Sequence, residues 1–588
     1  MVMRQNQTIS VTTSSGMFLS RDIRAENRKN LALYDVKHNL CDTGRSNSND
    51  FKYIILLYSR TLCISHQGNR KQMGKEEERA ELHRVIWKIA NELRGSVDGW
   101  DFKAYVLGML FYRFISEDLT RYLNEQELAA GEKDFDYTEL SDEDAENGRA
   151  STVAEKGYFI LPSELFQNVA KRCGADENLN ETLSGIFDAI EDSAKGTPSE
   201  QDMDGLFSDF NVNSNKLGAT VAQRNEKLCK IINEIGKLKL GSSISETTND
   251  TFGDAYEFLM KMYASNAGKS GGEFFTPQEV SRLVALLAIA GRRSLDSAYD
   301  PTVGSGSLLL QFRKILGDKV KNFYGQEINL TTYNLCRINM FLHGVNFERF
   351  DIRQGDTLVH PMHQEFEPFD AIGSNPPYSI KWPGDSDPTL INDPRFSPAG
   401  VLAPKAKADL AFTMHILSSL STTGTAAIVE FPGVLYRGGA EGKIREYLLS
   451  NNYVDTVIQL PENLFFGVSI AVCIIVLKKS KSDNSVLFID ASKEFIHEGN
   501  KNKLSEENIQ KIYSAYMDRK DVEHFACLKG NHAILENSSN LSVSSYVTPE
   551  DTSEKVDIRM LNEEIAGIVA KESELREKID AIIKDLED

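Results

Sequence analysis

The chain has 588 residues, of which 86 are acidic and 66 basic, so its formal net charge at pH 7 is −20. This length predicts two or three domains, and a hydrophobic content of 41% is enough for a substantial core, which excludes a globally disordered chain. So acidic a chain is not expected to hold DNA by general electrostatic attraction, because that needs a basic surface. No run approaches the roughly 18–20 apolar residues of a membrane span.

The cysteines and histidines predict neither a disulfide framework nor a metal site. The seven cysteines are widely spaced, without a CxxC pair, and lie at positions 41, 63, 173, 229, 336, 473 and 527. A reducing cytoplasm is therefore the expected compartment. The ten histidines show neither HxxxH nor HExxH spacing, so we expect no bound metal.

Residues 1–72 differ in composition from the rest of the chain. They carry 11 Lys and Arg against 5 Asp and Glu, and they show no sustained period of 3.6 or 2 residues. From Met73 onward, apolar residues recur at helical spacing. We expect Met73 to be the natural start and residues 1–72 to be a spurious extension; a genuine disordered tail is the alternative.

Residues 73–245 are predicted to form an all-α domain. Apolar residues recur at helical spacing in five stretches that acidic or polar connections separate. These stretches are Trp87–Leu93, Phe102–Tyr122, Pro162–Lys171, Leu179–Asp192 and Val221–Leu238. A run of Gly, Ser, Thr and Asn around 241–251 is a credible linker to the next domain.

Residues 246–500 are predicted to form an α/β domain with a mostly parallel sheet, because short apolar strands alternate with amphipathic helices. The strands are expected at Ser297–Tyr299, Asn322–Tyr324, Asp370–Ile372, Ala426–Glu430, Thr456–Gln459, Ile470–Leu477 and Val486–Ile489.

Residues 501–588 are expected to be a helical segment for contact with a partner. The last helix, Val556–Leu586, has an apolar seam at spacings of three and four residues, which suits a coiled coil or a partner helix. A surface helix on the same domain is the alternative, since amphipathicity alone does not name what a helix packs against.

A Gly-rich turn over Asp300–Ser307 follows the first predicted strand and precedes a helix. Glycines let a backbone approach a ligand closely, although such a turn also simply closes a strand–helix unit. The next strand ends in Glu327, and an acid at that position can accept both hydroxyls of a ribose. Together the turn and the acid predict a nucleoside ligand.

The stretch that indicates the chemistry is Asn375-Pro376-Pro377-Tyr378, directly after an apolar strand. The two prolines stiffen the turn and remove backbone donors. The Asn375 oxygen and the Pro376 carbonyl could accept the hydrogens of an exocyclic amine, which would localise its lone pair towards an electrophilic methyl group. Tyr378 offers a face for an extruded base, and the alternative is a rigid polar turn whose tyrosine only packs.

The order of these motifs resembles the amino-group DNA methyltransferases of the γ class, and most of all the modification (M) subunit of type I restriction–modification systems. The likeness covers 75–588. It rests on Gly272–Pro277, Asp300–Gly306, Glu327, Gly355-Asp356 and Asn375–Tyr378, and also on Gly95–Phe102, Asn392-Asp393, Leu402–Lys405, Tyr436–Glu441 and Asn540–Tyr546.

The resemblance implies a Rossmann-like S-adenosylmethionine-dependent methyltransferase fold, with S-adenosylmethionine as donor and adenine N6 in DNA as acceptor. It implies a catalytic role for Asn375, Pro376, Pro377 and Tyr378. The residues that it places at the cofactor's methionine end are Glu273, Phe274, Phe275, Thr276, Pro277 and Gln278. It places Asp300, Gly304, Ser305, Gly306 and Ser307 beside the cofactor backbone, Glu327 at the ribose and Asp356 at the adenine amine. From the sequence alone, Thr276 and Pro277 also suit the N-cap and first position of a helix.

The resemblance also implies partners: double-stranded DNA with a flipped adenine, a specificity (S) subunit that reads the DNA site in an M2S1 complex, and a restriction (R) subunit. It implies a bacterial or archaeal cytoplasm. Two alternatives stay open, a protein glutamine N-methyltransferase and an inactive scaffold subunit. Intact Asn375–Tyr378 and Glu327 argue against the scaffold, and the large helical domain argues against the small protein methylases.

Overall fold

The computed structural model describes residues 84, 101–238, 252–253, 255–260, 276–465, 467–499, 501–550 and 558–587. The expectations for residues 1–72 and for a helix at 87–93 lie outside these residues. In the part of the chain that the model describes, no helix combines the length and the apolar composition needed to cross a bilayer.

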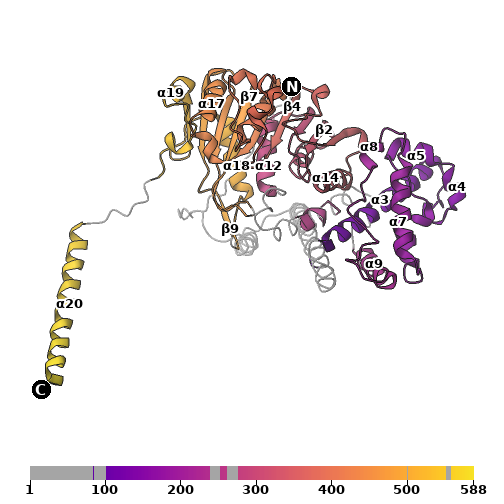
Figure 1. Cartoon of the computed structure of the whole chain (residues 1–588), viewed down its shortest axis with the longest axis horizontal. Helices are drawn as coiled ribbons and strands as arrows, with labels where there is room; N and C mark the ends of the chain where they lie inside the picture. Colours follow the sequence, from indigo (N-terminus) through magenta and orange to yellow (C-terminus); the bar gives the residue numbers. More distant parts are fainter. Residues whose placement is uncertain are drawn as a thin grey trace, which may run out of the picture. The chain divides into compact units, whose positions relative to one another are not determined.

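Residues 101–238 are helical, and the structure assigns no strand within this range. The helices are α3 (Asp101–Ala130), α4 (Asp142–Glu146), α5 (Arg149–Lys156), α6 (Phe166–Arg172), α7 (Leu179–Ser193), α8 (Glu200–Met203) and α9 (Val221–Gly236) (Figure 1). Four of the five helices predicted from the sequence are therefore present, and the fifth is the one outside the described residues.

Aromatic side chains hold these helices together. Tyr112 of α3 is fully buried and meets the rings of Phe166 and Phe187 edge to face, each with 5.5 Å between centroids. Helix α9 begins at a capping box in which Thr220 and Gln223 satisfy each other's backbone N–H groups. The apolar faces from which these helices were predicted therefore pack together in one core.

One sheet of nine strands forms the second part of the fold (Figure 1). Its strands are β1 (Leu295–Asp300), β2 (Val320–Glu327), β3 (Phe350–Gln354), β4 (Phe369–Ser374), β5 (Leu420–Glu430), β6 (Val454–Gln459), β7 (Cys473–Lys478), β8 (Ser485–Asp490) and β11 (Ala526–Gly530). The order across the sheet is β11-β8-β6-β7-β5-β4-β1-β2-β3. Five pairings are parallel, and β7 and β11 run antiparallel to their neighbours.

The mostly parallel sheet confirms the predicted fold class, and all seven predicted strands are present. The chain runs outward from β1 through β2 to β3, then returns to β4 on the other side of β1. The space beyond the carboxyl ends of β1 and β4 is therefore the topological switch point, where ligands bind in open α/β sheets.

Helices pack against the sheet. They are α12 (Gln278–Ile289), α13 (Leu309–Leu316), α14 (Leu330–Leu342), α15 (Pro388–Ile391), α16 (Asp409–Ser419), α17 (Ala440–Ser450), α18 (Glu506–Asp518) and α19 (Asn531–Glu536). Helices α12 and α16 pack against β5, and α13 packs against β2. In β7, five consecutive residues, 473–477, are buried, as expected for a strand covered on both faces.

The sheet extends beyond residue 500, where we expected the catalytic domain to end. Strand β11 pairs with β8 over five residues, and Tyr516 of α18 donates to the Leu287 carbonyl of α12 at 3.3 Å. A short hairpin of β9 (Ile496–Glu498) and β10 (Lys501–Lys503) also spans that boundary. The helical pattern of α18 predicted a helical segment here. A single short edge strand such as β11 gives little sequence signal, so the continuation of the sheet was not predicted.

The helical region packs on the sheet domain through α14. Arg337 is 1% exposed, and its Nη1 donates to the carbonyls of Gln201 and Asp204, both at 2.9 Å. The rings of Phe111 and Phe341 meet with 6.2 Å between centroids. These contacts join the two parts into one hydrophobic core.

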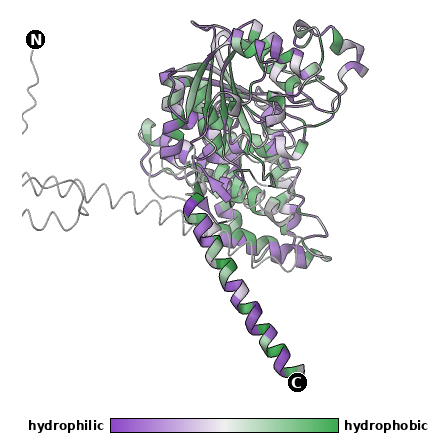
Figure 2. Ribbon diagram, turned by 90° about the vertical axis from the view of Figure 1, so that its left-hand side faces the viewer, coloured by the Kyte–Doolittle hydropathy of each residue, from purple (hydrophilic) through white to green (hydrophobic). Residues whose placement is uncertain are grey.

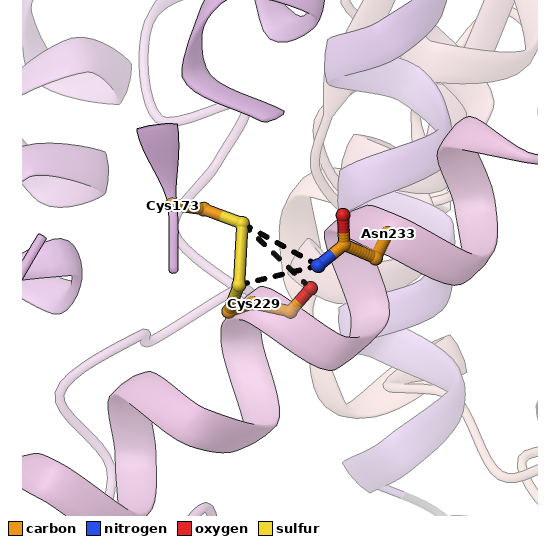
Figure 3. Close-up of a disulfide and its surroundings, with 3 residues drawn as sticks. All are labelled: Cys173, Cys229 and Asn233. Carbon is orange, nitrogen blue, oxygen red and sulfur yellow. Dashed lines mark hydrogen bonds between the residues drawn. A yellow bond between two sulfur atoms is a disulfide. The ribbon is translucent and has the colours of Figure 1, made fainter. Parts of the chain in front are cut away.

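A disulfide links Cys173, at the end of α6, to Cys229 within α9, with 5.4 Å between the Cα atoms (Figure 3). The amide of Asn233 donates to the Sγ of Cys229 at 3.3 Å. The sequence predicted no disulfide framework, and this one pair was not foreseen. The two cysteines are 56 residues apart, and the packing of α6 on α9 brings them together, which no spacing motif reveals.

The last helix, α20, spans Ile558–Glu587, close to the predicted 556–586. Its apolar residues alternate with charged ones along the whole helix (Figure 2). Ion pairs one turn apart, Arg576 with Glu572 and Lys578 with Glu574, support the helix on its charged faces. Its large apolar side chains are all exposed, between 45% and 81%.

Candidate active site

The Gly-rich turn after β1 and the Asn375–Tyr378 turn after β4 lie side by side at the switch point. Ser374, the last residue of β4, donates its hydroxyl to Asp300 Oδ1 at 2.8 Å. The hydroxyls of Ser374 and Thr302 are also 2.8 Å apart. These bonds join the two predicted motifs directly.

Asp300 lies beneath the turn and not at its surface. It is 1% exposed, and its Oδ1 also accepts the Thr302 amide N–H at 3.0 Å. Burial raises its pKa to about 7. The structure therefore gives Asp300 the role of fastening the turn to β4.

The two glycines of the turn adopt backbone conformations that favour glycine. Gly304 has a φ of 55° and Gly306 a φ of 78°. A Cβ on Gly306 would stand 2.8 Å from the Cys336 sulfur of α14. Ser305 and Ser307 are both 3% exposed, with their hydroxyls 3.1 Å apart, so their side chains lie inside the turn. The outer surface of the turn is therefore formed by backbone atoms and not by these side chains.

Glu327 ends β2 opposite this turn. Its Oε2 accepts the Gly304 amide N–H at 3.1 Å, and its Oε1 accepts the Asn329 N–H at 2.8 Å. Burial raises its pKa, while these backbone N–H groups oppose the rise. Each carboxylate oxygen keeps a second lone pair, so both can still accept a ligand hydroxyl.

Asp356 follows β3, the neighbour of β2, and is half-buried. Its Oδ1 accepts the Leu358 N–H at 2.9 Å. Ile328, directly after Glu327, is an apolar side chain that is 63% exposed. Sequence reasoning missed Ile328, and the signal that could have found it is an apolar residue directly after the acid at the strand tip.

Three of the six residues expected at the methionine end, Glu273, Phe274 and Phe275, lie outside the described residues. Helix α12 begins at Gln278 with Pro277 as its N-cap, one residue later than we expected from the sequence. No described side chain caps this helix, and the Thr276 hydroxyl accepts a hydrogen bond from Asn375. Among the described residues, the buried Gln278 Nε2 has no hydrogen-bond partner.

The side chain of Asn375 is held from both sides. Its Nδ2 donates to the Thr276 hydroxyl at 3.0 Å, and its Oδ1 accepts from the Tyr378 hydroxyl at 2.8 Å. These two bonds fix the orientation of the amide. The structure thus brings Thr276 into the Asn375–Tyr378 turn, which sequence spacing could not show.

Tyr378 lies over a buried pair of acids. Its pKa is raised well above the usual value, first by burial and then by Glu430, with Asp409 contributing less. The Thr413 hydroxyl donates to Glu430 Oε1 at 2.7 Å. The ring of Phe465 meets Tyr378 edge to face, with 6.5 Å between centroids. Neither Glu430 nor Phe465 was singled out in the sequence.

Glu430 should make the stability of the fold fall as pH rises. Burial, helped by Asp409 and Glu441, raises its pKa to about 8, so the folded protein holds a proton that the unfolded chain releases near pH 4.5. The contribution of Glu430 to the stability of the fold is fully present below pH 4.5 and is lost as the pH rises to about 8. We expect Glu430→Gln to unfold at a higher temperature than the unsubstituted protein at pH 8.5 but not at pH 5. Differential scanning calorimetry at both values checks this, and a difference that does not change with pH would contradict it.

The matched control for this pH dependence is Glu441→Gln. Glu441 is also buried, at 4% exposure, but Arg437 pairs with its carboxylate at 3.5 Å. We expect this variant to follow the unsubstituted protein across the same pH range.

Comparison with known proteins identifies the family of this chain. The family model "N-6 DNA Methylase" matches residues 247–555, and "HsdM N-terminal domain" matches 82–235. The type I restriction enzyme MpnII methylase subunit of Mycoplasma pneumoniae is 47% identical over 530 residues, which cover 87% of this chain and 97% of that protein. The MjaVII methylase subunit of Methanocaldococcus jannaschii is 29% identical over 531 residues, with 86% and 84% covered.

Among solved structures, the methyltransferase subunit of a type I restriction–modification system from Streptococcus thermophilus matches with a TM-score of 0.72 and 38% identity. The match covers 80% of this chain and 99% of that one. The chain therefore belongs to the methylase subunits of type I restriction enzymes, N6-adenine DNA methyltransferases whose methyl donor is S-adenosylmethionine.

Proposed function

We propose that Asn375, Pro376, Pro377 and Tyr378 carry out methyl transfer to an adenine N6 that has been flipped out of double-stranded DNA. The observation that supports this most directly is the orientation of the Asn375 amide between Thr276 and Tyr378. It leaves a lone pair of Oδ1 for an incoming amine, because a carbonyl oxygen accepts two hydrogen bonds.

The residues of the turn act on the amine and on the base. Asn375 Oδ1 and the Pro376 carbonyl accept the two N6 hydrogens, which draws the nitrogen lone pair out of the ring and aims it at the methyl group. Bound S-adenosylmethionine supplies an electrophilic methyl on a sulfonium. Tyr378 stacks on the flipped base, and its hydroxyl bond to Asn375 holds ring and amide in one geometry.

The cofactor residues fit a nucleoside with a charged tail. Glu327 would accept the ribose hydroxyls, Asp356 would accept from the adenine amine, and Ile328 would lie against the base. The buried Gln278 Nε2 is a donor that needs an acceptor, which a carboxylate group would supply. The buried Asp300, Ser305 and Ser307 would shape the turn from inside, and Gly304 and Gly306 would let its backbone approach the ligand.

Glu327→Ala should weaken S-adenosylmethionine binding by roughly 1.5–3 kcal/mol, the scale of a charge-assisted hydrogen bond lost from a partly buried site. Glu327→Gln, which keeps an acceptor for the Gly304 N–H, should lose less. Isothermal titration calorimetry with S-adenosylmethionine measures both. Unchanged affinity in the Ala variant would remove Glu327 from the ribose contact.

We further propose that the chain acts in a bacterial or archaeal cytoplasm as part of an M2S1 complex, in which an S subunit reads the DNA site, and that an R subunit joins this complex for restriction. Its formal charge supports this, because 81 acidic against 55 basic residues from position 73 onward cannot neutralise a polyanion alone. Helical residues 73–245 would help to close around the duplex, and 556–588 would contact the S subunit.

One assay separates this function from its alternatives. The chain purified together with its S subunit is given S-adenosylmethionine with a radiolabelled methyl group, plus DNA and a protein extract. Label recovered as N6-methyladenine in the DNA supports the proposal. Label in protein glutamine would support the protein methyltransferase, and label in neither would support an inactive scaffold.

A further inference from the structure

The residue directly after the Asn375–Tyr378 turn has a backbone conformation that needs support. Ser379 has a φ of 52°, in the left-handed region that residues with a Cβ adopt at an energetic cost. Its side chain is exposed, so side-chain packing does not hold it there. Its amide N–H donates to Asp409 Oδ1 at 3.0 Å. This hydrogen bond is the contact that fixes where the turn ends.

Asp409 is built into the structure beneath this residue. It is 1% exposed and is the first residue of α16, where the positive end of the helix dipole favours an acid. Next to it, the Ala408 amide N–H donates to the Ile380 carbonyl at 3.0 Å. The other oxygen of Asp409, Oδ2, is buried and has no hydrogen-bond partner among the described residues. Among the described residues, the Ser379 N–H is therefore the hydrogen-bond donor that this carboxyl group receives.

The same face of α16 supports Tyr378. Thr413, one turn after Asp409, donates to Glu430 Oε1 at 2.7 Å, and the Cys473 thiol donates to the Glu430 carbonyl at 3.3 Å. After burial, the neighbouring Glu430, Cys473 and Asp409 are what raise the pKa of the Tyr378 hydroxyl. Helix α16 and the end of β5 thus form one support below the tyrosine and the residue that follows it.

We propose that Asp409 is a positioning residue for methyl transfer: by accepting the Ser379 N–H it holds the left-handed backbone that sets Asn375 and Tyr378 in register with the flipped adenine. It touches neither substrate nor cofactor. The inference rests on the proposed role of Asn375–Tyr378. Because this contact lies at the end of the turn away from Glu327, its loss should slow the chemical step and leave cofactor binding unchanged.

Four variants of the full chain, purified with the S subunit, test the role of Asp409. Asp409→Ala should lower kcat by about 30-fold, with the Kd for S-adenosylmethionine within about twofold of the unsubstituted complex. Asp409→Asn keeps an acceptor for the Ser379 N–H, so its kcat should stay within about fivefold. Ser379→Gly alone should change kcat by less than about twofold, since glycine adopts this φ freely.

The double variant Asp409→Ala with Ser379→Gly distinguishes backbone positioning from general destabilisation. If Asp409 acts by holding the left-handed residue, glycine should recover most of the lost kcat, to within about threefold of the unsubstituted complex. A double variant as slow as Asp409→Ala would overturn the proposal, because glycine cannot repair a collapsed core.

Asn375→Ala, assayed in parallel, separates this inference from the proposed function. An inactive Asn375→Ala beside a fully active Asp409→Ala overturns the positioning role alone, whereas an active Asn375→Ala overturns the proposed site. Hydrogen exchange of the unsubstituted complex, resolved at single residues by mass spectrometry, tests the contact even if Asp409→Ala fails to fold. Protection of the Ser379 amide on an exposed residue supports the proposal, and exchange at the rate of a free amide overturns it.

Discussion

Replacing Asn375 by alanine should lower kcat for adenine methylation by about a thousandfold or more, and leave the Kd for S-adenosylmethionine within about twofold. The Asn375 oxygen is the acceptor that we propose acts on the reacting amine, while the acids proposed to bind the cofactor lie elsewhere, Glu327 at the end of β2 and Asp356 after β3. Loss of the acceptor therefore acts on the transition state and not on binding of the donor. Steady-state incorporation of labelled methyl groups gives kcat, and calorimetry gives the affinity.

The matched control for Asn375 is Thr276→Val, which keeps the shape of the side chain and removes only the acceptor of the Asn375 Nδ2–H. The amide then loses one of its two anchors but keeps the bond from Tyr378, so we expect a fall in kcat of about tenfold. Near-normal turnover by Asn375→Ala would remove the turn from the chemistry. Equal losses for the two variants would mean that orientation, and not the acceptor itself, is what the amide contributes.

How far the sequence predicted this site depends on how local each feature is. The Asn375–Tyr378 turn follows one strand with a plain apolar pattern, and Glu327 ends another. Their place at the carboxyl edge of the sheet could therefore be predicted from the sequence alone. Thr276 is 99 residues from Asn375, and its contact required the actual packing of α12 on β4. The same holds for Asp409, 30 residues from Ser379, whose acid reads in the sequence as an ordinary helix start.

The fold shows the same division between local pattern and packing. The strands with apolar runs were predicted. Strand β3 was not, because its sequence, Phe-Asp-Ile-Arg-Gln, carries charged residues. At the edge of the sheet these charges are paired, Arg353 with Asp351 at 2.8 Å. The link between Cys173 and Cys229 is likewise a product of helix packing. Features that depend on distant partners leave little trace in a single sequence.

The second large effect should come from the apolar seam of α20. It consists of Ile558, Leu561, Ile565, Ile568, Leu575, Ile579, Ile582, Ile583 and Leu586; most neighbours are three or four residues apart, and Ile568 and Leu575 are seven apart. All are at least 45% exposed, so the seam is an exposed row of large apolar side chains. A heptad seam of this kind buries itself against another helix, and each large side chain so buried contributes about 1.5–3 kcal/mol.

Ile568→Glu together with Ile579→Glu should therefore abolish co-purification with the S subunit, because the pair would place two charges inside a helix interface. Ala570→Glu with Ala581→Glu adds the same charge away from the seam on the same helix, and should leave the complex intact. Affinity purification on a tagged S subunit, followed by native mass spectrometry, measures both retention and the ratio of chains. Full retention by the seam variant would show that α20 is not the contact, while loss in both variants would point to charge and not to the seam. Because the S subunit reads the DNA site in the proposed complex, the seam variant should also lose site-specific methylation yet bind S-adenosylmethionine as before, which separates assembly from catalysis.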